Sequence, residues 1–180
     1  MFLGAIFALF VGLLIYGWSL PQTFVFEQSI PIKADSDEIY AEIDEMDRIR
    51  NWAPYVSGLG NDDRAITGAE RGSGQLVNWR QSVVPFESGT QEVLAVTPPY
   101  FVQSRFSSAP YDGSIIYALN EGLPNEDVTV LVRLDLDAGS FPFFERIKLR
   151  RNQSAINQEL TRALARLKTC LLYTSPSPRD

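Results

Sequence analysis

The chain opens with an apolar run that contains no charged side chain. Residues 1–20 are mostly Leu, Ile, Phe, Ala, Val and Gly, and the first charged residue is Glu27. At about 1.5 Å of rise per residue, about twenty helical residues span roughly 30 Å, the thickness of a bilayer's hydrocarbon core. Tyr16 and Trp18 near the end of the run are aromatic residues, which favour the lipid–water boundary. The pattern therefore predicts a transmembrane anchor over residues 1–20.

A cleaved signal peptide is the alternative interpretation of the same run. A signal peptide carries Lys or Arg ahead of an apolar segment of about 7–15 residues. No such cation precedes this run, and Gly17-Trp18-Ser19 is a poor cleavage site. We therefore favour the anchor. Lys and Arg are too far away to indicate the orientation, but acidic residues follow the run, so we expect a periplasmic or extracytoplasmic domain.

Beyond the apolar run, the pattern switches between the strand period and the helix period. Thr23–Ile32 is rich in β-branched and aromatic residues and predicts a strand. Ser36–Asp44 has apolar residues at helical spacing and acidic residues in its first turn, and thus predicts a helix. A second short helix is predicted over Glu45–Trp52. Six further strands follow, separated by turn signals: Arg64–Ala69, Gly74–Gln81, Thr90–Val96, Phe101–Ser107, Ser114–Leu119 and Asp127–Leu136.

A long amphipathic helix is predicted from about Phe141 to Lys168, since apolar residues recur there every three or four positions. The chain thus predicts an α+β domain in which one helix covers the apolar face of an antiparallel sheet. Because sheets twist, such a sheet curves around the helix. We expect a cavity between the sheet and the helix, and we predict that this cavity is the functional site of the protein.

We interpret the last eleven residues of the chain as sequence that does not belong to the natural protein. Residues 170–180 read CLLYTSPSPRD, which resembles the translation of a transposase adapter used to prepare sequencing libraries. We therefore expect a non-native tail over 170–180 and exclude it from the fold. A genuine Ser/Pro-rich tail is the alternative. The predicted domain then covers residues 23–169, and its natural C-terminus is left open.

Composition excludes several classes of function. With 45% hydrophobic and 21% charged residues, the chain is ordinary globular protein of a length suited to one domain. It contains no His, which is the commonest general base and zinc ligand, and its one Cys is Cys170. A net charge of -6 argues against nucleic-acid binding. We expect no metal and no cofactor.

The order of these motifs resembles the SRPBCC superfamily, also called START-like or polyketide cyclase/dehydrase-like domains. The resemblance covers essentially Phe24 to Lys168, and it rests on the order of the motifs rather than on any one of them. It implies a helix-grip fold, in which a curved seven-stranded antiparallel sheet wraps around the C-terminal helix, here preceded by one transmembrane helix. It also implies a pocket for an apolar small molecule. The motifs are Val25–Ala34, Ser36–Ile43, Trp52-Ala53-Pro54, Gly72-Ser73-Gly74 with Trp79, Glu92–Pro99, Thr129–Val132 and Leu164–Lys168.

Seven residues are candidates for binding a ligand in that pocket. Trp79 shares a strand face with Gln75 and Val77, so it could form an aromatic wall, or its ring could simply fill the core. Arg105 could orient a carboxylate or carbonyl group if it points inward, and a solvated strand residue is the alternative. The other candidates are aromatic residues near the short helices, on the strands and at the start of the long helix. The full set is Trp52, Tyr55, Trp79, Arg105, Phe106, Tyr117 and Phe144.

Charged clusters admit two interpretations each. Arg146, Lys148, Arg150 and Arg151 form a basic cluster that could contact anionic lipid headgroups, at about 1 kcal/mol for each contact. A solvated helix face paired with acids is the alternative. The acidic cluster at Asp44–Asp47 lacks EF-hand spacing, which favours capping and surface groups over a calcium site.

Three functions remain open at this point. The first, which we favour, is a membrane-tethered domain that binds an apolar small molecule such as a lipid, polyketide or quinone and needs no chemistry. The second is a cyclase or dehydratase, which requires a positioned acid or base. The third is a protein–protein interaction module. The sequence leaves the ligand and the oligomeric state open.

Overall fold

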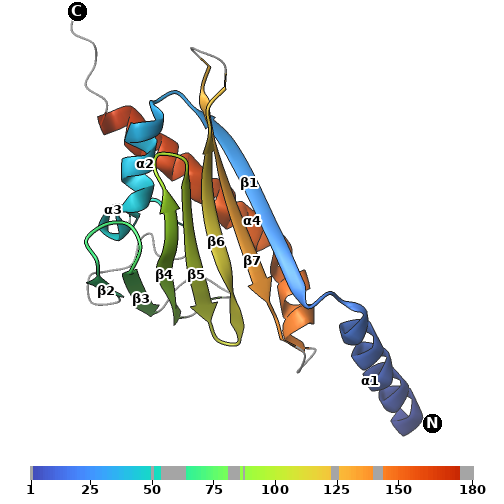
Figure 1. Cartoon of the computed structure of the whole chain (residues 1–180). Coiled ribbons are helices and arrows are strands. Elements are labelled where there is room, and N and C mark those ends of the chain that lie inside the picture. The colour runs from blue at the N-terminus through green and yellow to red at the C-terminus, as the bar shows by residue number, and fades with distance from the viewer. Residues whose placement is uncertain are drawn as a thin grey trace, which may run out of the picture.

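The computed structural model of the chain describes residues 2–49, 51–53, 64–80, 86, 88–122, 126–139 and 144–174. Helices and strands follow one another in the predicted order (Figure 1). The helices are α1 (Phe2–Ser19), α2 (Ser36–Asp44), α3 (Met46–Ile49) and α4 (Phe144–Thr174). The strands are β1 (Thr23–Ile32), β2 (Arg64–Gly68), β3 (Gln75–Arg80), β4 (Ser88–Thr97), β5 (Phe101–Ser108), β6 (Tyr111–Asn120) and β7 (Val128–Asp137).

The strands form one seven-stranded sheet in the order β1-β7-β6-β5-β4-β3-β2. Every neighbouring pair is antiparallel, from β1 against β7 to β3 against β2. The first strand therefore lies beside the last one, and the strands between them follow as a meander. This confirms the predicted seven-stranded antiparallel sheet with a long C-terminal helix.

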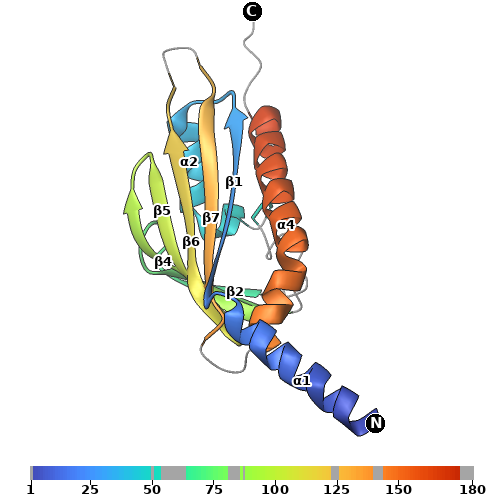
Figure 2. The ribbon, with the colours of Figure 1, turned by 90° about the vertical axis from the view of Figure 1, so that its right-hand side faces the viewer.

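Helices cover one face of the sheet, which we call the inner face. Figure 2 shows α4 running along this face, where it packs chiefly against β1. Strict alternation of buried and partly exposed residues marks the inner face, as in β7, whose buried members are Val128, Val130, Val132, Leu134 and Leu136. Each such side chain contributes about 1.5–3 kcal/mol when fully buried. The inner face is therefore the core of the domain.

The hairpin between β5 and β6 differs from its prediction. The sequence pattern treats Asp112-Gly113 as a turn, whereas the structure places both residues in β6, which begins at Tyr111. Gly113 pairs with Phe106 on one side and Leu136 on the other. A Cβ atom at Gly113 would collide with the backbone carbonyl of Asp135. Glycine is present here because two strands approach closely, and not because the chain turns.

The junction of α2 and α3 is attached to β3 by one buried amide. Gln75 accepts a hydrogen bond from the Met46 backbone N–H at 2.9 Å and donates to the carbonyls of Asp44, at 2.6 Å, and Gly72, at 3.0 Å. The amide thus satisfies backbone groups that the end of one helix and the start of the next leave without partners. The predicted helix over Glu45–Trp52 is correspondingly shorter in the structure, where α3 ends at Ile49.

Replacing Gln75 with Leu should lower the free energy of unfolding by about 2–4 kcal/mol, because it leaves buried backbone groups without partners. Urea unfolding followed by circular dichroism measures the change. Gln103, on the outer face of β5, supplies the control, and Gln103→Leu should change stability by less than about 0.5 kcal/mol. Equal effects of the two substitutions would contradict this role of Gln75.

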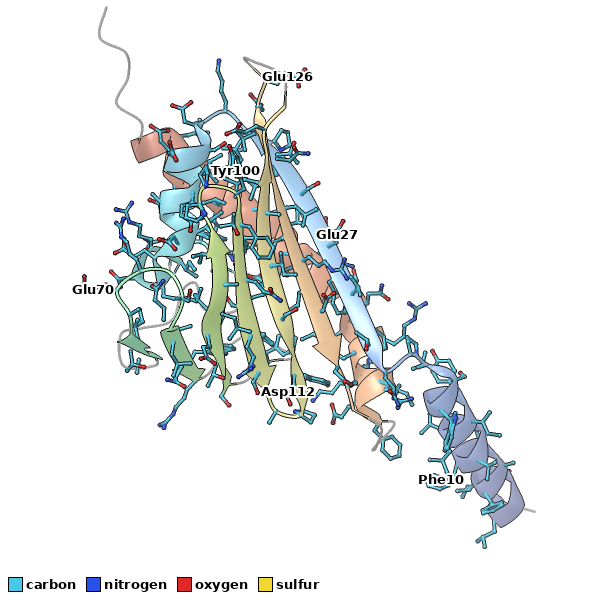
Figure 3. All side chains as sticks on the ribbon, in the orientation of Figure 1. Phe10, Glu27, Glu70, Tyr100, Asp112 and Glu126 are labelled. Atoms are coloured by element: carbon cyan, nitrogen blue, oxygen red, sulfur yellow. The ribbon has the colours of Figure 1, made fainter. Side chains whose placement is uncertain are left out.

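The N-terminal helix α1 leaves the domain as a separate rod. Figure 3 shows Phe10 on α1, well away from the sheet, and apolar residues such as Leu3, Phe7 and Leu9 are exposed. Among the described residues, no helix combines the length and the apolar character needed to traverse a bilayer. The transmembrane anchor predicted over 1–20 is therefore not found, although the helix itself is.

The two ends of α4 bear on two other predictions. Near its start, buried Arg146 donates hydrogen bonds to the backbone carbonyls of Leu20, at 3.2 Å, and Gly139, at 3.0 Å and 3.2 Å, which fastens the exit of α1 to α4. Arg146 is therefore not part of an exposed basic cluster with Lys148, Arg150 and Arg151, contrary to the prediction. At its other end, α4 continues to Thr174, and Leu171 is buried. The adapter origin of 170–180 stays a prediction.

Candidate functional site

Aromatic rings gather on the inner face over β3 to β6. The ring centroids of Trp79 and Phe106 are 5.5 Å apart, and those of Phe106 and Phe86 are 5.1 Å apart. Phe86 continues the row to Tyr111 at 5.9 Å, edge to face. All four side chains are buried. The rings pack tilted or edge to face, as aromatic pairs prefer, and make this part of the inner face strongly apolar.

A second aromatic pair lies where the short helices meet the sheet. Trp52 and Tyr117 pack edge to face with their centroids 5.4 Å apart. The Trp52 indole N–H donates to the Glu42 carbonyl at 3.1 Å, and the Trp52 carbonyl accepts from Arg166 of α4 at 3.1 Å. Trp52 therefore links α2, α4 and the inner face of β6.

Four polar atoms on the inner face have no hydrogen-bond partner among the described residues. They are Trp79 Nε1, Gln91 Nε2, Ser104 Oγ and Tyr117 Oη, and all four are buried. A buried polar group that makes no hydrogen bond costs about 1–3 kcal/mol. Most buried polar atoms in proteins do find partners, so this group needs an explanation. We call these four residues the polar quartet.

The strand register places the quartet side by side. Ser104 pairs with Val93 on β4, so Gln91 is its diagonal neighbour, and Tyr117 pairs with Val102, the other inward residue next to Ser104. Burial raises the pKa of the Tyr117 phenol, and a hydrogen-bonding interaction with the Gln91 side chain opposes that rise. These two groups therefore lie near each other across β5, although neither atom makes a hydrogen bond of good geometry. Gln91, Ser104 and Tyr117 thus lie near one another on adjacent strands, and Trp79 on β3 is the diagonal neighbour of Gln91.

The patch has no charged member. The only buried charged residues among those described are Arg146 and Glu159, and both are occupied elsewhere. Glu159 pairs with Arg166 at 2.7 Å, and Arg146 bonds backbone carbonyls. The described residues also contain no cluster of metal-ligating side chains. The inner face therefore offers uncharged hydrogen-bonding groups, of which the indole and amide N–H groups can only donate.

An ionisable group does border the aromatic row at one end. The Tyr111 hydroxyl donates a hydrogen bond to the Glu145 carboxylate of α4. Burial, that hydrogen bond and the nearby carboxylate charge all raise the pKa of the Tyr111 phenol. Lys148 lies 3.7 Å from Glu145 and over the Tyr111 ring. With its hydroxyl already donating to Glu145, Tyr111 is a structural contact between β6 and α4.

A glycine makes room for the largest ring. Gly89 of β4 pairs with Trp79 of β3, and the indole lies across the glycine. A Cβ atom at Gly89 would lie only 2.6 Å from Trp79 Cζ2 and would also meet the Ser107 carbonyl. The position of the Trp79 ring is therefore set by the missing side chain beside it.

Solved structures share this architecture. Norcoclaurine synthase from Thalictrum flavum has a TM-score of 0.61 at 10% identity, with 89% of this chain and 92% of that chain covered. The Aha1 dimer structure from Colwellia psychrerythraea has a TM-score of 0.52 at 18% identity, covering 82% and 96%. The di-domain ARO/CYC protein StfQ from the steffimycin biosynthetic pathway has a TM-score of 0.59 at 12% identity, covering 84% and 51%.

The fold is a helix grip. This confirms the helix-grip fold expected from the motif order, and at these identities the likeness shows the fold alone. No family model matches the chain, and no curated protein matches it in sequence. The chain spans about half the length of the di-domain protein, as one domain of that protein would.

The helix-grip fold sorts the predicted site residues into two groups. Trp52, Trp79, Phe106 and Tyr117 all lie buried on the inner side. Arg105 does not, because its neighbour Phe106 points inward and successive strand residues face opposite ways. It pairs instead with Glu92 on the outer face, at 3.4 Å.

The remaining two candidates do not join the inner group. Phe144 is 47% exposed at the first turn of α4 and does not line the interior. Tyr55 lies outside the described residues. Sequence reasoning missed Gln91 and Ser104, although each is a polar residue at an inward position between apolar ones, and that signal could have found them.

The sequence predicts a cavity between the sheet and the long helix α4. The cavities that described residues line include one on α1, one along α4 with Gln28 of β1 in its wall, and one between α4 and Asn51. The cavity expected between the sheet and α4 stays a prediction. The polar quartet is the feature that distinguishes the described part of this interior.

Proposed function

We propose that the domain binds an apolar small molecule against its inner face, between the sheet and α4. The observation that carries this proposal is the polar quartet, since four buried polar atoms lack partners among the described residues. A bound molecule with oxygen acceptors would supply those partners, while the aromatic row would contact its rings or chain. Polyketide ARO/CYC proteins share the fold, which supports this choice of ligand class.

The quartet also narrows the ligand chemistry. Its indole and amide N–H groups donate hydrogen bonds, and its two hydroxyls can donate as well. No cation accompanies them among the described inner-face residues, so a carboxylate would be buried without a counter-charge, which is costly. We therefore propose a neutral ligand with carbonyl or hydroxyl oxygens, such as a quinone or a polyketide-like ring system, rather than a fatty-acid anion.

Membrane association is the second part of the proposal. The exposed apolar side chains of α1 would enter lipid and hold the domain at a membrane. The acidic residues that follow the helix lead us to propose a periplasmic or extracytoplasmic placement. A membrane is also where a sparingly soluble ligand would be concentrated.

A matched ligand pair tests the binding proposal. The full chain in neutral detergent would be titrated with 1,4-naphthoquinone and with naphthalene, and quenching of tryptophan fluorescence would be measured. A Trp18→Phe background leaves Trp52 and Trp79 as the reporters. The quinone should bind at least about tenfold more tightly, as expected for one or two new hydrogen bonds. Equal affinities, or no binding of either compound, would contradict the proposal and favour the interaction-module alternative.

Removing the hydroxyl group of Tyr117 from the polar quartet should raise the stability of the protein and weaken its binding of the ligand. Tyr117→Phe removes a buried hydroxyl that makes no hydrogen bond of good geometry to the described residues, so the ligand-free protein should gain up to about 1 kcal/mol of stability. The same change should weaken quinone binding several-fold. Thermal unfolding and the fluorescence titration measure the two effects. Tyr40→Phe is the control, since the Tyr40 hydroxyl already bonds Asp44 at 3.3 Å and lies on α2.

A further inference from the structure

A polar groove runs along α4, separate from the inner-face site. Its volume is about 910 Å³, and it is open to solvent. One wall residue comes from β1, the edge strand of the sheet, and the rest come from a single face of α4. The lining residues are Gln28, Arg150, Arg151, Gln153, Ser154, Asn157, Gln158, Thr161 and Arg162. We call this the α4 groove.

The lining of the groove is positively charged, whereas the protein as a whole is acidic. Three arginines line the groove, and the other lining residues are amides and hydroxyls, with no carboxylate among them. The whole chain carries a net charge of -6. Arg150 bonds the neutral Gln153 side chain at 2.6 Å, so its charge is not cancelled there. Arg162 lies 3.6 Å from Glu159, but that carboxylate is shared with Arg166.

The floor of the groove is held in place by amides. Gln28 donates to Asn157 at 3.4 Å and accepts from Thr161 at 3.3 Å. Phe24, Phe26 and Ile32 on the same side of β1 are buried and apolar, so Gln28 interrupts an apolar row with a polar contact to α4. This contact leaves hydrogen-bonding groups, rather than apolar ones, between the strand and the helix.

The basic end of the groove lies next to the exit of α1. Arg146 bonds the Leu20 carbonyl, and Arg150 follows one helical turn later, about 6 Å further along the α4 axis. Figure 2 shows the start of α4 beside the end of α1. If α1 enters lipid, the first arginines of the groove lie at the height of the headgroups.

We propose that the α4 groove binds the phosphate-bearing headgroup of an anionic membrane lipid. Guanidinium groups match phosphate oxygens in geometry and charge, and they remain protonated throughout the physiological range. Amide and hydroxyl donors along the groove would bond the rest of the headgroup. The lipid as the source of the phosphate rests on the proposed membrane association. The site itself does not depend on the inner-face ligand.

Short-chain lipids test this proposal on the full chain in neutral dodecyl maltoside micelles. Dihexanoyl phosphatidylglycerol, dihexanoyl phosphatidylcholine and inorganic phosphate would each be titrated by calorimetry at low and high salt. The test variant is Arg150→Gln with Arg151→Gln. The matched control is Arg105→Gln with Arg133→Gln, which removes the same charge from the outer face, where these arginines pair with Glu92 and Asp135.

The expected result is that phosphatidylglycerol binds at least about tenfold more tightly than phosphatidylcholine, and that binding weakens as salt rises. The groove variant should lose that preference, and the control should keep it within about twofold. Equal binding of the two lipids, or equal losses in variant and control, would overturn the site. If inorganic phosphate binds as tightly as phosphatidylglycerol, a free phosphate is the ligand, and the lipid assignment is wrong. Naphthoquinone binding should be the same in all these variants.

Discussion

Replacing Trp52 with Ala should lower the free energy of unfolding by about 3–5 kcal/mol, the range for large buried aromatic side chains. Trp52 is fully buried, packs on Tyr117 and donates its indole N–H to the Glu42 carbonyl. Its removal opens a cavity where α2, α4 and the sheet meet. The loss therefore includes both the packing of the ring and a buried hydrogen bond.

Urea unfolding of the full chain in neutral detergent measures this effect. Trp18→Ala is the matched control, because Trp18 is 72% exposed on α1 and its loss should leave domain stability within about 0.5 kcal/mol. Trp52→Phe should fall between the two, since it keeps a ring but loses the hydrogen bond to Glu42. A loss below about 1 kcal/mol for Trp52→Ala would show that this contact is not part of the cooperative core.

The second large effect concerns α1. Leu9→Lys with Leu13→Lys places two charges one helical turn apart among exposed apolar residues. An unpaired charge is costly to bury among apolar lipid tails. Membrane association should therefore be lost almost completely. Flotation of the full chain with phosphatidylcholine vesicles measures the bound fraction and avoids any contribution from anionic lipid.

The control for this experiment places the same charges elsewhere. Val25→Lys with Leu94→Lys changes two exposed apolar residues on the sheet. That variant should float with vesicles as the parent chain does. If the parent chain itself stays in the aqueous fraction, or if the two variants behave alike, α1 does not hold the domain at a membrane. The inner-face binding test is unaffected by either outcome.

Periodicity predicted most of the fold, because each strand buries one face. The bounds of β1 and α2 agree with the predicted ranges, and β7 alternates as predicted. The start of β6 was wrong, since a glycine required by the close approach of β7 has the same sequence signature as a turn glycine. Local sequence does not distinguish these two causes.

The candidate site was predicted less completely. Phe106 and Tyr117, two of the predicted candidates, do lie on the inner face. Arg105 immediately precedes Phe106 and faces the other way, since successive strand residues point to opposite faces. Whether a buried polar group has a partner depends on contacts across the sheet. Gln75 and Gln91 look alike in the sequence, yet the first makes three hydrogen bonds and the Nε2 of the second makes none among the described residues. That difference is visible only in three dimensions.

The close fit of Trp79 over Gly89 has a consequence for how such chains diverge. A β-carbon at position 89 would occupy the space that the six-membered part of the indole now fills. The Ser107 backbone carbonyl would lie closer still to that β-carbon, and a smaller residue at 79 does not move it. Descendants of this sequence should therefore keep glycine at position 89, even where position 79 changes.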